Sequence, residues 1–126
     1  MTAPLLGEAL GTFLMVLFGT GAVACSVLTG ALQGLWQVAS VWAVGVTVAI
    51  YIAAPLSGAH LNPAVTLAFV VFRSFPPRQL PAYWLAQLVG AGVAGGTVLV
   101  VFGPMLERFE MHEGITRGAA EASAPP

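Results

Sequence analysis

Three long stretches of apolar residues dominate the chain. They cover residues 5–28, 35–56 and 81–103, and Glu8 is the only charged residue within them. A helix that crosses a lipid bilayer needs about 20 predominantly apolar residues. Each stretch therefore predicts a transmembrane helix, and the fold class predicted for the chain is an all-α membrane protein.

A fourth apolar stretch is too short to cross a bilayer. Residues 63–72 would extend about 15 Å as a helix, roughly half the hydrocarbon thickness. Asn62 is a favoured N-cap, and Pro63 suits the first helical position because its missing N–H would have no partner there. We therefore expect residues 57–72 to form a re-entrant loop and a half-helix that returns to the same side of the membrane.

The polarity of the chain changes after Gly103. Charged residues recur over residues 105–118, and residues 119–126 are mostly small and end in two prolines. This composition is typical of chain that leaves the membrane and lacks fixed structure. We expect residues 1–104 to form one membrane-embedded unit and residues 105–126 a polar, disordered connector or tail.

Composition narrows the function classes. The chain is 58% hydrophobic and 7% charged, with a net charge of −1, whereas soluble domains carry about 25% charged residues. The bilayer is therefore the expected partner, and the lack of a basic run argues against nucleic acid. A single cysteine, Cys25, allows no internal disulfide. The N-terminus has no positive segment, so we expect the first stretch to remain as a helix.

The segment around Asn62 has the chemistry of a pore for small neutral molecules. A half-helix that begins in mid-membrane presents free N–H groups and about half a positive charge, which repels cations. The Asn62 amide can donate a hydrogen bond to a hydroxyl or to water. The extended backbone of residues 58–61 can offer carbonyl acceptors, and irregular backbone at this depth is tolerated only where protein buries it or where it lines a cavity. Asn-Pro is also a common turn signal, so the dipeptide alone would carry little weight.

Residues 57–66, Ser-Gly-Ala-His-Leu-Asn-Pro-Ala-Val-Thr, resemble the first Asn-Pro-Ala box of the aquaporin (major intrinsic protein) family, and of its glycerol facilitators in particular. The likeness extends along the chain from residue 5 to about residue 118. Residues 7–21 are similar to the first helix of the family, residues 36–52 to the second, residues 83–91 to the third, and residues 109–118 to the connector that follows in glycerol facilitators.

The resemblance implies roles for particular residues. Asn62, Pro63 and Ala64 would form half of the midpoint constriction of a pore. Pore-lining carbonyls would come from the preceding residues, Gly58, Ala59, His60 and Leu61. Trp42 matches the aromatic residue of the glycerol-type selectivity filter. Glu8 would accept hydrogen bonds from the amides of the re-entrant loop and act as its structural brace.

Simpler interpretations exist for several of these residues. Trp42 could be an interfacial aromatic, but Trp36 lies about 9 Å nearer the helix end and suits that position better. A carboxyl group in a membrane costs about 2.5–3.5 kcal/mol, so Glu8 needs a partner. His60 is expected to position the loop because no second metal ligand lies at usable spacing. We expect no cofactor and no metal, and the chain is not expected to be an enzyme. Gln87 is expected to form a hydrogen bond between helices.

The family pairs two inverted repeats around each pore, whereas this chain contains one. No second Asn-Pro-Ala is present to oppose residues 62–64. Three interpretations follow: a truncated or split-gene fragment, a half-channel that joins a separately made second half, or an antiparallel homodimer. The positive residues do not orient the chain, since Arg73 and Arg78 on one side balance Arg108 and Arg117 on the other.

The expected function is passive transport of water and small neutral solutes such as glycerol, by a multi-pass protein of the bacterial inner membrane. The alternative is a non-conducting fragment, or an accessory membrane subunit that packs on complete channels. The resemblance suggests a second channel half or other copies of the chain as partners, in a tetramer. The sequence leaves the preference between water and glycerol open because half of the filter is absent.

Overall fold

Four α-helices form the structure, a computed structural model that describes residues 2–116. The long helices are α1 (Thr2–Thr29), α2 (Leu35–Ser57) and α4 (Leu80–Glu113). The short helix α3 (Pro63–Phe72) and a single 3₁₀ turn, η1 (Pro77–Gln79), lie between α2 and α4. Residues 2–116 contain no β-strand. The predicted all-α fold, with three long apolar helices and one short helix, is confirmed.

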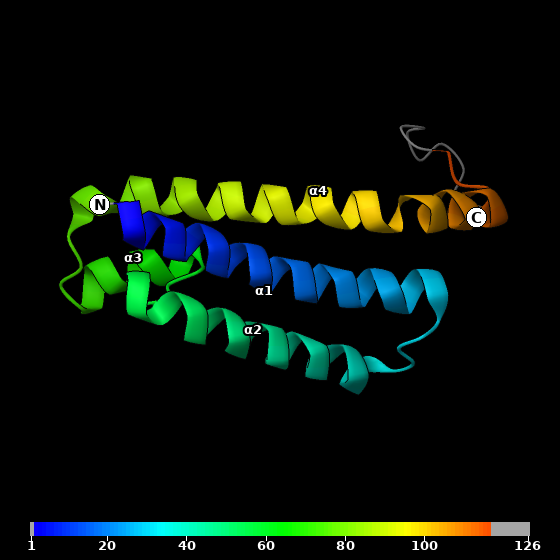
Figure 1. The fold of residues 1–126 in the computed structure, drawn as a ribbon, viewed down its shortest axis with the longest axis horizontal. Helices are drawn as coiled ribbons and strands as arrows, with labels where there is room; N and C mark the ends of the chain where they lie inside the picture. Colours follow the sequence, from blue (N-terminus) through cyan, green and yellow to red (C-terminus); the bar gives the residue numbers. More distant parts are fainter. Residues whose placement is uncertain (1, 117–126) are drawn as a thin grey trace, which may run out of the picture.

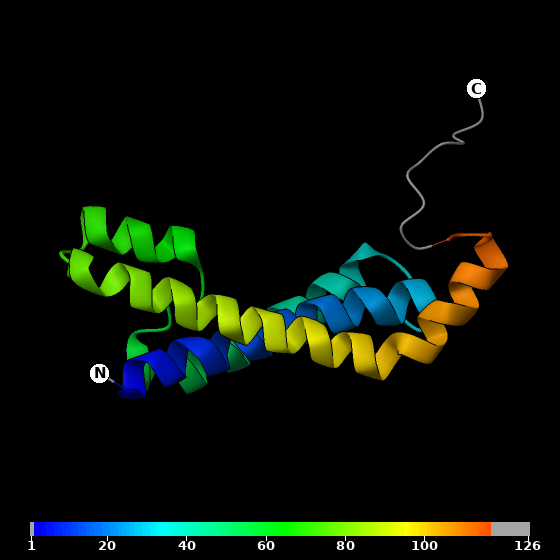
Figure 2. The same ribbon diagram turned by 90° about the horizontal axis from the view of Figure 1, so that it is seen from above.

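The central helix is α1, which packs against both α2 and α4 (Figure 1). The chain leaves the end of α2, turns inward, and returns through α3 to the end of the molecule at which α1 and α4 begin (Figure 1). The half-helix α3 lies along the first part of α4 (Figure 2). This path is the re-entrant path predicted from the length of residues 63–72.

The three long helices have the length and hydropathy of membrane spans. Each contains an 18-residue window with a mean hydropathy of 1.9. Large apolar side chains remain exposed on their outer faces, among them Leu35, Tyr51 and Val100, which are 85%, 78% and 80% exposed. A soluble monomer rarely exposes apolar surface on this scale. The chain is an integral, multi-pass membrane protein.

Glycines bring the helices into close contact. A Cβ atom added at Gly7 would lie 2.8 Å from Leu56 Cβ, and one at Gly11 would lie 2.8 Å from Ala53 Cβ, so both glycines pack α1 directly on α2. On α4, a Cβ at Gly90 would overlap the backbone carbonyl of Ala9. Small residues at helix interfaces are typical of membrane proteins, where backbones approach closely.

Gly92 and Gly96 are four residues apart, as Gly7 and Gly11 are, but they form no such interface within residues 2–116. No atom lies within 4 Å of a Cβ added at either position. Gly90 provides the contact with α1 instead. It lies two residues before Gly92, which turns the side-chain direction by about 200° around a helix with 3.6 residues per turn.

The sequence predicts a disordered tail from residue 105, and for residues 105–113 this prediction is wrong. The helix α4 continues through Pro104 to Glu113, and it ends at Gly114, whose φ of 67° allows the N–H to bond to Glu110 O. At 34 residues, α4 is about 51 Å long, so it extends beyond the hydrocarbon. Figure 2 shows α4 bending in its yellow-to-orange part, where Pro104 removes a helical hydrogen bond. The rest of the predicted tail, residues 117–126, lies outside the described residues.

Candidate functional site

The carboxylate of Glu8 lies at the centre of the loop that joins α2 to α3. Its side chain is fully buried, at 0% exposure. Oε1 accepts hydrogen bonds from Ser57 Oγ at 2.6 Å and from the backbone N–H of His60 at 2.9 Å. Oε2 accepts from the backbone N–H of Leu61 and from Gln87 Nε2, both at 2.7 Å. Both oxygens are therefore fully engaged, which offsets the cost of burying the group.

These bonds fix the direction in which the loop carbonyls point. The N–H groups of His60 and Leu61 point at Glu8, and that of Ala59 points at Ser57 Oγ at 3.1 Å. The peptide bonds are all trans, so each carbonyl points opposite to the N–H of the next residue. The carbonyls of Gly58, Ala59 and His60 consequently face away from Glu8. No hydrogen bond within residues 2–116 uses them as acceptors.

The loop holds two non-glycine residues in the left-handed region. Ala59 and Leu61 both have a φ of 52°, after Gly58 at 85°. A non-glycine residue in this region costs about 1–3 kcal/mol and persists only when the surroundings hold it. The hydrogen bonds that successive backbone N–H groups donate to Ser57 Oγ and to the Glu8 carboxylate supply that constraint. The strain is consistent with a loop shaped to present its carbonyls on one side.

Asn62 caps the half-helix. Its extended backbone has a φ of −153°, and Oδ1 accepts a hydrogen bond from the N–H of Ala64 at 2.8 Å. The capping bond requires the amide oxygen, so the NH₂ group of Asn62 remains as a donor with no protein partner in residues 2–116. Asn62, Pro63 and Ala64 are all exposed. The amide donor and the N-terminal end of α3 therefore lie on the side of the loop that faces away from Glu8, which we call the open side.

His60 is enclosed by aromatic rings rather than by metal ligands. Its ring centroid lies 4.3 Å from that of Phe69, 4.8 Å from that of Phe75 and 5.1 Å from that of Tyr83. Its side chain is 5% exposed. Residues 2–116 contain no group of three side chains able to hold a metal ion. The ring attaches the loop to α3 and α4.

Hydrogen bonds from α4 hold the loop and α3 in place. Gln87 Nε2 donates to Thr66 Oγ1 at 2.9 Å as well as to Glu8, so the predicted bond between helices is confirmed. Tyr83 donates from its hydroxyl to Ser57 O at 3.1 Å, and Trp84 donates from Nε1 to Pro63 O at 3.0 Å. Sequence reasoning assigned no role to Thr66, Tyr83 or Trp84. The one signal available was that Tyr83 and Gln87 lie four residues apart, on one helix face.

Trp42 lies apart from this cluster. Its half-buried ring packs against α1 at Gly19, where an added Cβ would overlap the indole. Trp42 precedes Ser57 by 15 residues on α2, which places it about 22 Å farther along the helix. The structure brings together all the other predicted site residues, whereas Trp42 lies nearer the first residue of α2, Leu35, than its last residue, Ser57. Its role as a filter residue stays a prediction.

Comparisons with known proteins agree with this geometry. The family description "Major intrinsic protein" matches residues 2–123. The glycerol uptake facilitator protein of Pseudomonas aeruginosa is 44% identical over 94% of this chain, and that of Haemophilus influenzae is 39% identical over 97%. The crystal structure of the aquaglyceroporin from Plasmodium falciparum superposes with a TM-score of 0.78 at 35% identity, over 85% of this chain.

The likeness covers less than half of each relative. The chain spans 43% of the Pseudomonas protein, 46% of the Haemophilus protein and 44% of the Plasmodium chain. The predicted resemblance over nearly the whole chain is nevertheless confirmed, since the family match leaves out only residue 1 and residues 124–126. The protein belongs to the major intrinsic protein family.

Proposed function

We propose that this chain forms half of a passive channel for water and small neutral solutes such as glycerol. The observation that carries the proposal is the polarity of the loop. The N–H groups of Ala59, His60 and Leu61 are bonded inward, while three successive carbonyls and the Asn62 amide remain available on the open side. A hydroxyl-bearing solute that passes this surface would exchange its bonds to water for bonds to fixed acceptors and one donor.

The same surface disfavours ions. It carries no charged side chain, because the one charge nearby, Glu8, is buried and fully engaged behind the loop. The N-terminal end of α3 adds about half a positive charge at the point where Asn62 lies. Permeation would therefore be diffusive, without a chemical step. The names of the relatives, glycerol uptake facilitators and an aquaglyceroporin, support transport rather than catalysis.

Each site residue has a part in this proposal. Asn62, Pro63 and Ala64 form one half of the narrow midpoint, and residues 58–61 supply the carbonyl acceptors. Glu8 is the brace that fixes the loop from behind. Trp42 would pack against the carbon backbone of a solute in the filter, at a position on α2 about 22 Å from Ser57.

A complete pore needs a second wall. Among residues 2–116, nothing covers the exposed face of Asn62, Pro63 and Ala64. Polar backbone left against lipid would cost several kcal/mol per group. We propose that a second channel half covers this face in the inner membrane of a bacterium, and that such channels assemble as tetramers.

A chimera tests the channel function. Residues 2–104 would replace the matching segment of the Pseudomonas aeruginosa relative, and glycerol permeability would be measured by stopped-flow light scattering on proteoliposomes. We expect permeability close to that of the parent, and its loss in a chimera with Asn62→Asp, because a carboxylate removes the amide donor and adds a charge. A well-folded chimera no more permeable than empty liposomes would refute the proposal.

A second candidate is a non-conducting subunit that packs on complete channels. The observation that favours it is the exposed face of Asn62, Pro63 and Ala64, which could rest against another membrane protein instead of a solute path. Co-purification with a full-length relative separates the two functions. A non-conducting subunit would remain bound to the intact channel, whereas a channel half would bind only the complementary half.

A further inference from the structure

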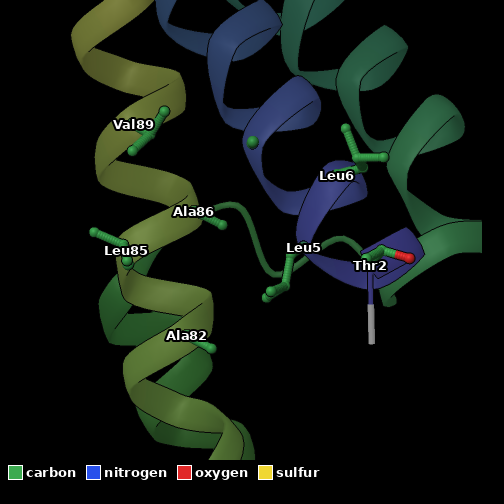
Figure 3. A pocket seen from close by; sticks show the side chains of 8 residues that line it. Thr2, Leu5, Leu6, Ala82, Leu85, Ala86 and Val89 are labelled. Atoms are coloured by element: carbon green, nitrogen blue, oxygen red, sulfur yellow. The ribbon is translucent and has the colours of Figure 1, made fainter.

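A groove lies between α1 and α4, and none of the loop residues 58–61 is among the residues that border it. It has a volume of about 420 Å³ and is bordered by Leu5, Leu6 and Ala9 of α1 and by Ala82, Leu85 and Ala86 of α4. Figure 3 shows Ala82 and Ala86 facing α1 across the opening, with Leu5 opposite them. The two alanines lie one helical turn apart and so on the same face of α4. Their small side chains leave a space between α1 and α4 that larger side chains would fill.

The groove has a closed end and an open end. It closes near Gly90, where α4 contacts the Ala9 carbonyl without any side chain between them. Toward the N-terminus of α1 the two helices separate (Figure 2). There the groove continues into a second hollow of about 270 Å³, which shares Leu5 and Ala82 with it and is also bordered by Arg78 and Gln79.

The length of this path matches one leaflet of a bilayer. Arg78 of η1 and Val89 of α4, the farthest residues along it, are 11 positions apart, or about 16 Å. Half of the hydrocarbon core is about 15 Å thick. The groove thus runs from the membrane surface, where Arg78 lies, to mid-membrane, where Gly90 closes it.

Charge at the open end favours an anion. Arg78 is exposed and forms no ion pair within residues 2–116. Arg73 lies at the same end, and the described carboxylates other than buried Glu8 lie at the far end of α4, at Glu107, Glu110 and Glu113. The N-terminus of α1 adds partial positive charge beside the second hollow. An apolar groove bordered by another part of α1 and α4, near Val98, has no charged residue on its border.

We propose that this groove binds one anionic phospholipid. One acyl chain lies between α1 and α4 over Ala82 and Ala86, and the phosphate group contacts Arg78. The bound chain fills the space between the helix that contributes Glu8 and the helix that contributes Gln87 and Tyr83, so it supports the loop from outside.

Native mass spectrometry of the purified chain tests the site. The chain in detergent would be titrated with phosphatidylglycerol and with phosphatidylcholine that have identical acyl chains, and lipid-bound species would be counted. A basic residue near the surface strengthens binding of anionic lipid about fivefold. We expect about that preference for phosphatidylglycerol in the parent chain. Arg78→Gln should abolish the preference, and Arg73→Gln, equally exposed but outside the groove, should retain it.

A second pair of variants tests the acyl-chain position. Ala86→Leu fills the groove and should weaken binding of both lipids, whereas Ala24→Leu, on the border of the uncharged groove, should not change the preference. Circular dichroism would establish that all variants are helical. Equal loss of preference in Arg78→Gln and Arg73→Gln would overturn the proposal, since it would mean a diffuse charge effect. Unchanged binding in Ala86→Leu, or a dimer that excludes lipid from the groove, would overturn it as well.

Discussion

At the scale of single residues, Glu8 joins parts of the chain that are far apart in sequence. Its carboxylate accepts from residues 49 to 79 positions away, on the end of α2, the re-entrant loop and α4. Two of these bonds satisfy the backbone N–H groups of His60 and Leu61, which have no other acceptor within residues 2–116 and lie at membrane depth, where water is not available to replace the carboxylate. One side chain therefore sets both the position of the loop and the direction of its carbonyls.

Replacement of Glu8 by glutamine tests this role. One oxygen becomes an NH₂ group that faces other donors, so the two hydrogen bonds that this oxygen accepts are lost. Hydrogen bonds to charged acceptors are worth about 1.5–3 kcal/mol each. We expect the free energy of unfolding, measured by titration with a denaturing detergent, to fall by about 3 kcal/mol. The matched control, Glu107→Gln on the exposed end of α4, should change it little. Similar values for both variants would contradict the bracing role.

Residue chemistry could be predicted where it depends on neighbours in the sequence. Asn62 before Pro63 indicates an N-cap, and the structure has that cap. Trp84 could not be predicted to donate to Pro63 O, because that bond exists only once α3 has folded back onto α4. Gln87 could be predicted to bond between helices, but not to join Glu8 to Thr66.

At the scale of elements, the half-helix α3 depends on α4 for its position. Ten residues make a helix that is marginal in isolation. Trp84 holds its first residue by the bond to Pro63 O, and Gln87 holds its second turn through Thr66. The N-terminal end of α3, with Asn62 beside it, is therefore positioned by the first two turns of α4.

Removal of the indole donor should loosen α3. Trp84→Phe keeps most of the apolar surface and removes one hydrogen bond worth about 1 kcal/mol. We expect amide hydrogen exchange over residues 63–72 to become about fivefold faster, as mass spectrometry of peptides would measure. Trp36→Phe is the control, since Trp36 is 73% exposed and its indole has no partner in residues 2–116. Unchanged exchange in Trp84→Phe would show that the bond does not hold α3.

Helix contacts make a separate prediction for two glycines of α4. Gly90→Ala places a methyl group on the Ala9 carbonyl, a backbone atom that cannot turn aside, so α1 and α4 must separate. We expect a loss of about 1–3 kcal/mol in the free energy of unfolding, typical of overpacking. Gly92→Ala adds a methyl group where nothing lies within 4 Å. It should be neutral or stabilising by up to about 1 kcal/mol. The opposite ranking of the two variants would contradict the packing described for α4.

The bounds of the half-helix could be predicted well, and the end of the last helix poorly. Residues 63–72 match α3 because a capping asparagine, a proline and a polar segment mark both ends. The end of α4 could not be placed, because Pro104 and the charged residues after it resemble a helix exit. A proline within a long helix can bend it instead, and charged residues are favourable on a helix that has already left the hydrocarbon.

At the scale of the whole molecule, one face of the chain carries polar groups that have no hydrogen-bond partner within residues 2–116. The N–H groups of Ala59, His60 and Leu61 are bonded to Ser57 and Glu8, whereas no hydrogen bond in the described part of the chain uses the carbonyls of Gly58, Ala59 and His60 or the NH₂ group of Asn62. The single repeat could be predicted from the sequence, since it contains one Asn-Pro-Ala segment. What completes the proposed pore depends on a second surface, which this sequence does not specify.

The most direct test of the half-channel is a measurement of glycerol permeability in proteoliposomes. The proteoliposomes contain this chain together with the C-terminal part of the Pseudomonas aeruginosa relative, made as a separate polypeptide. We predict permeability above that of liposomes holding either polypeptide alone, and its loss when this chain carries Asn62→Asp. If the two polypeptides form a stable complex and the liposomes are still no more permeable to glycerol than empty ones, the proposal that residues 58–64 line half of a conducting pore is contradicted.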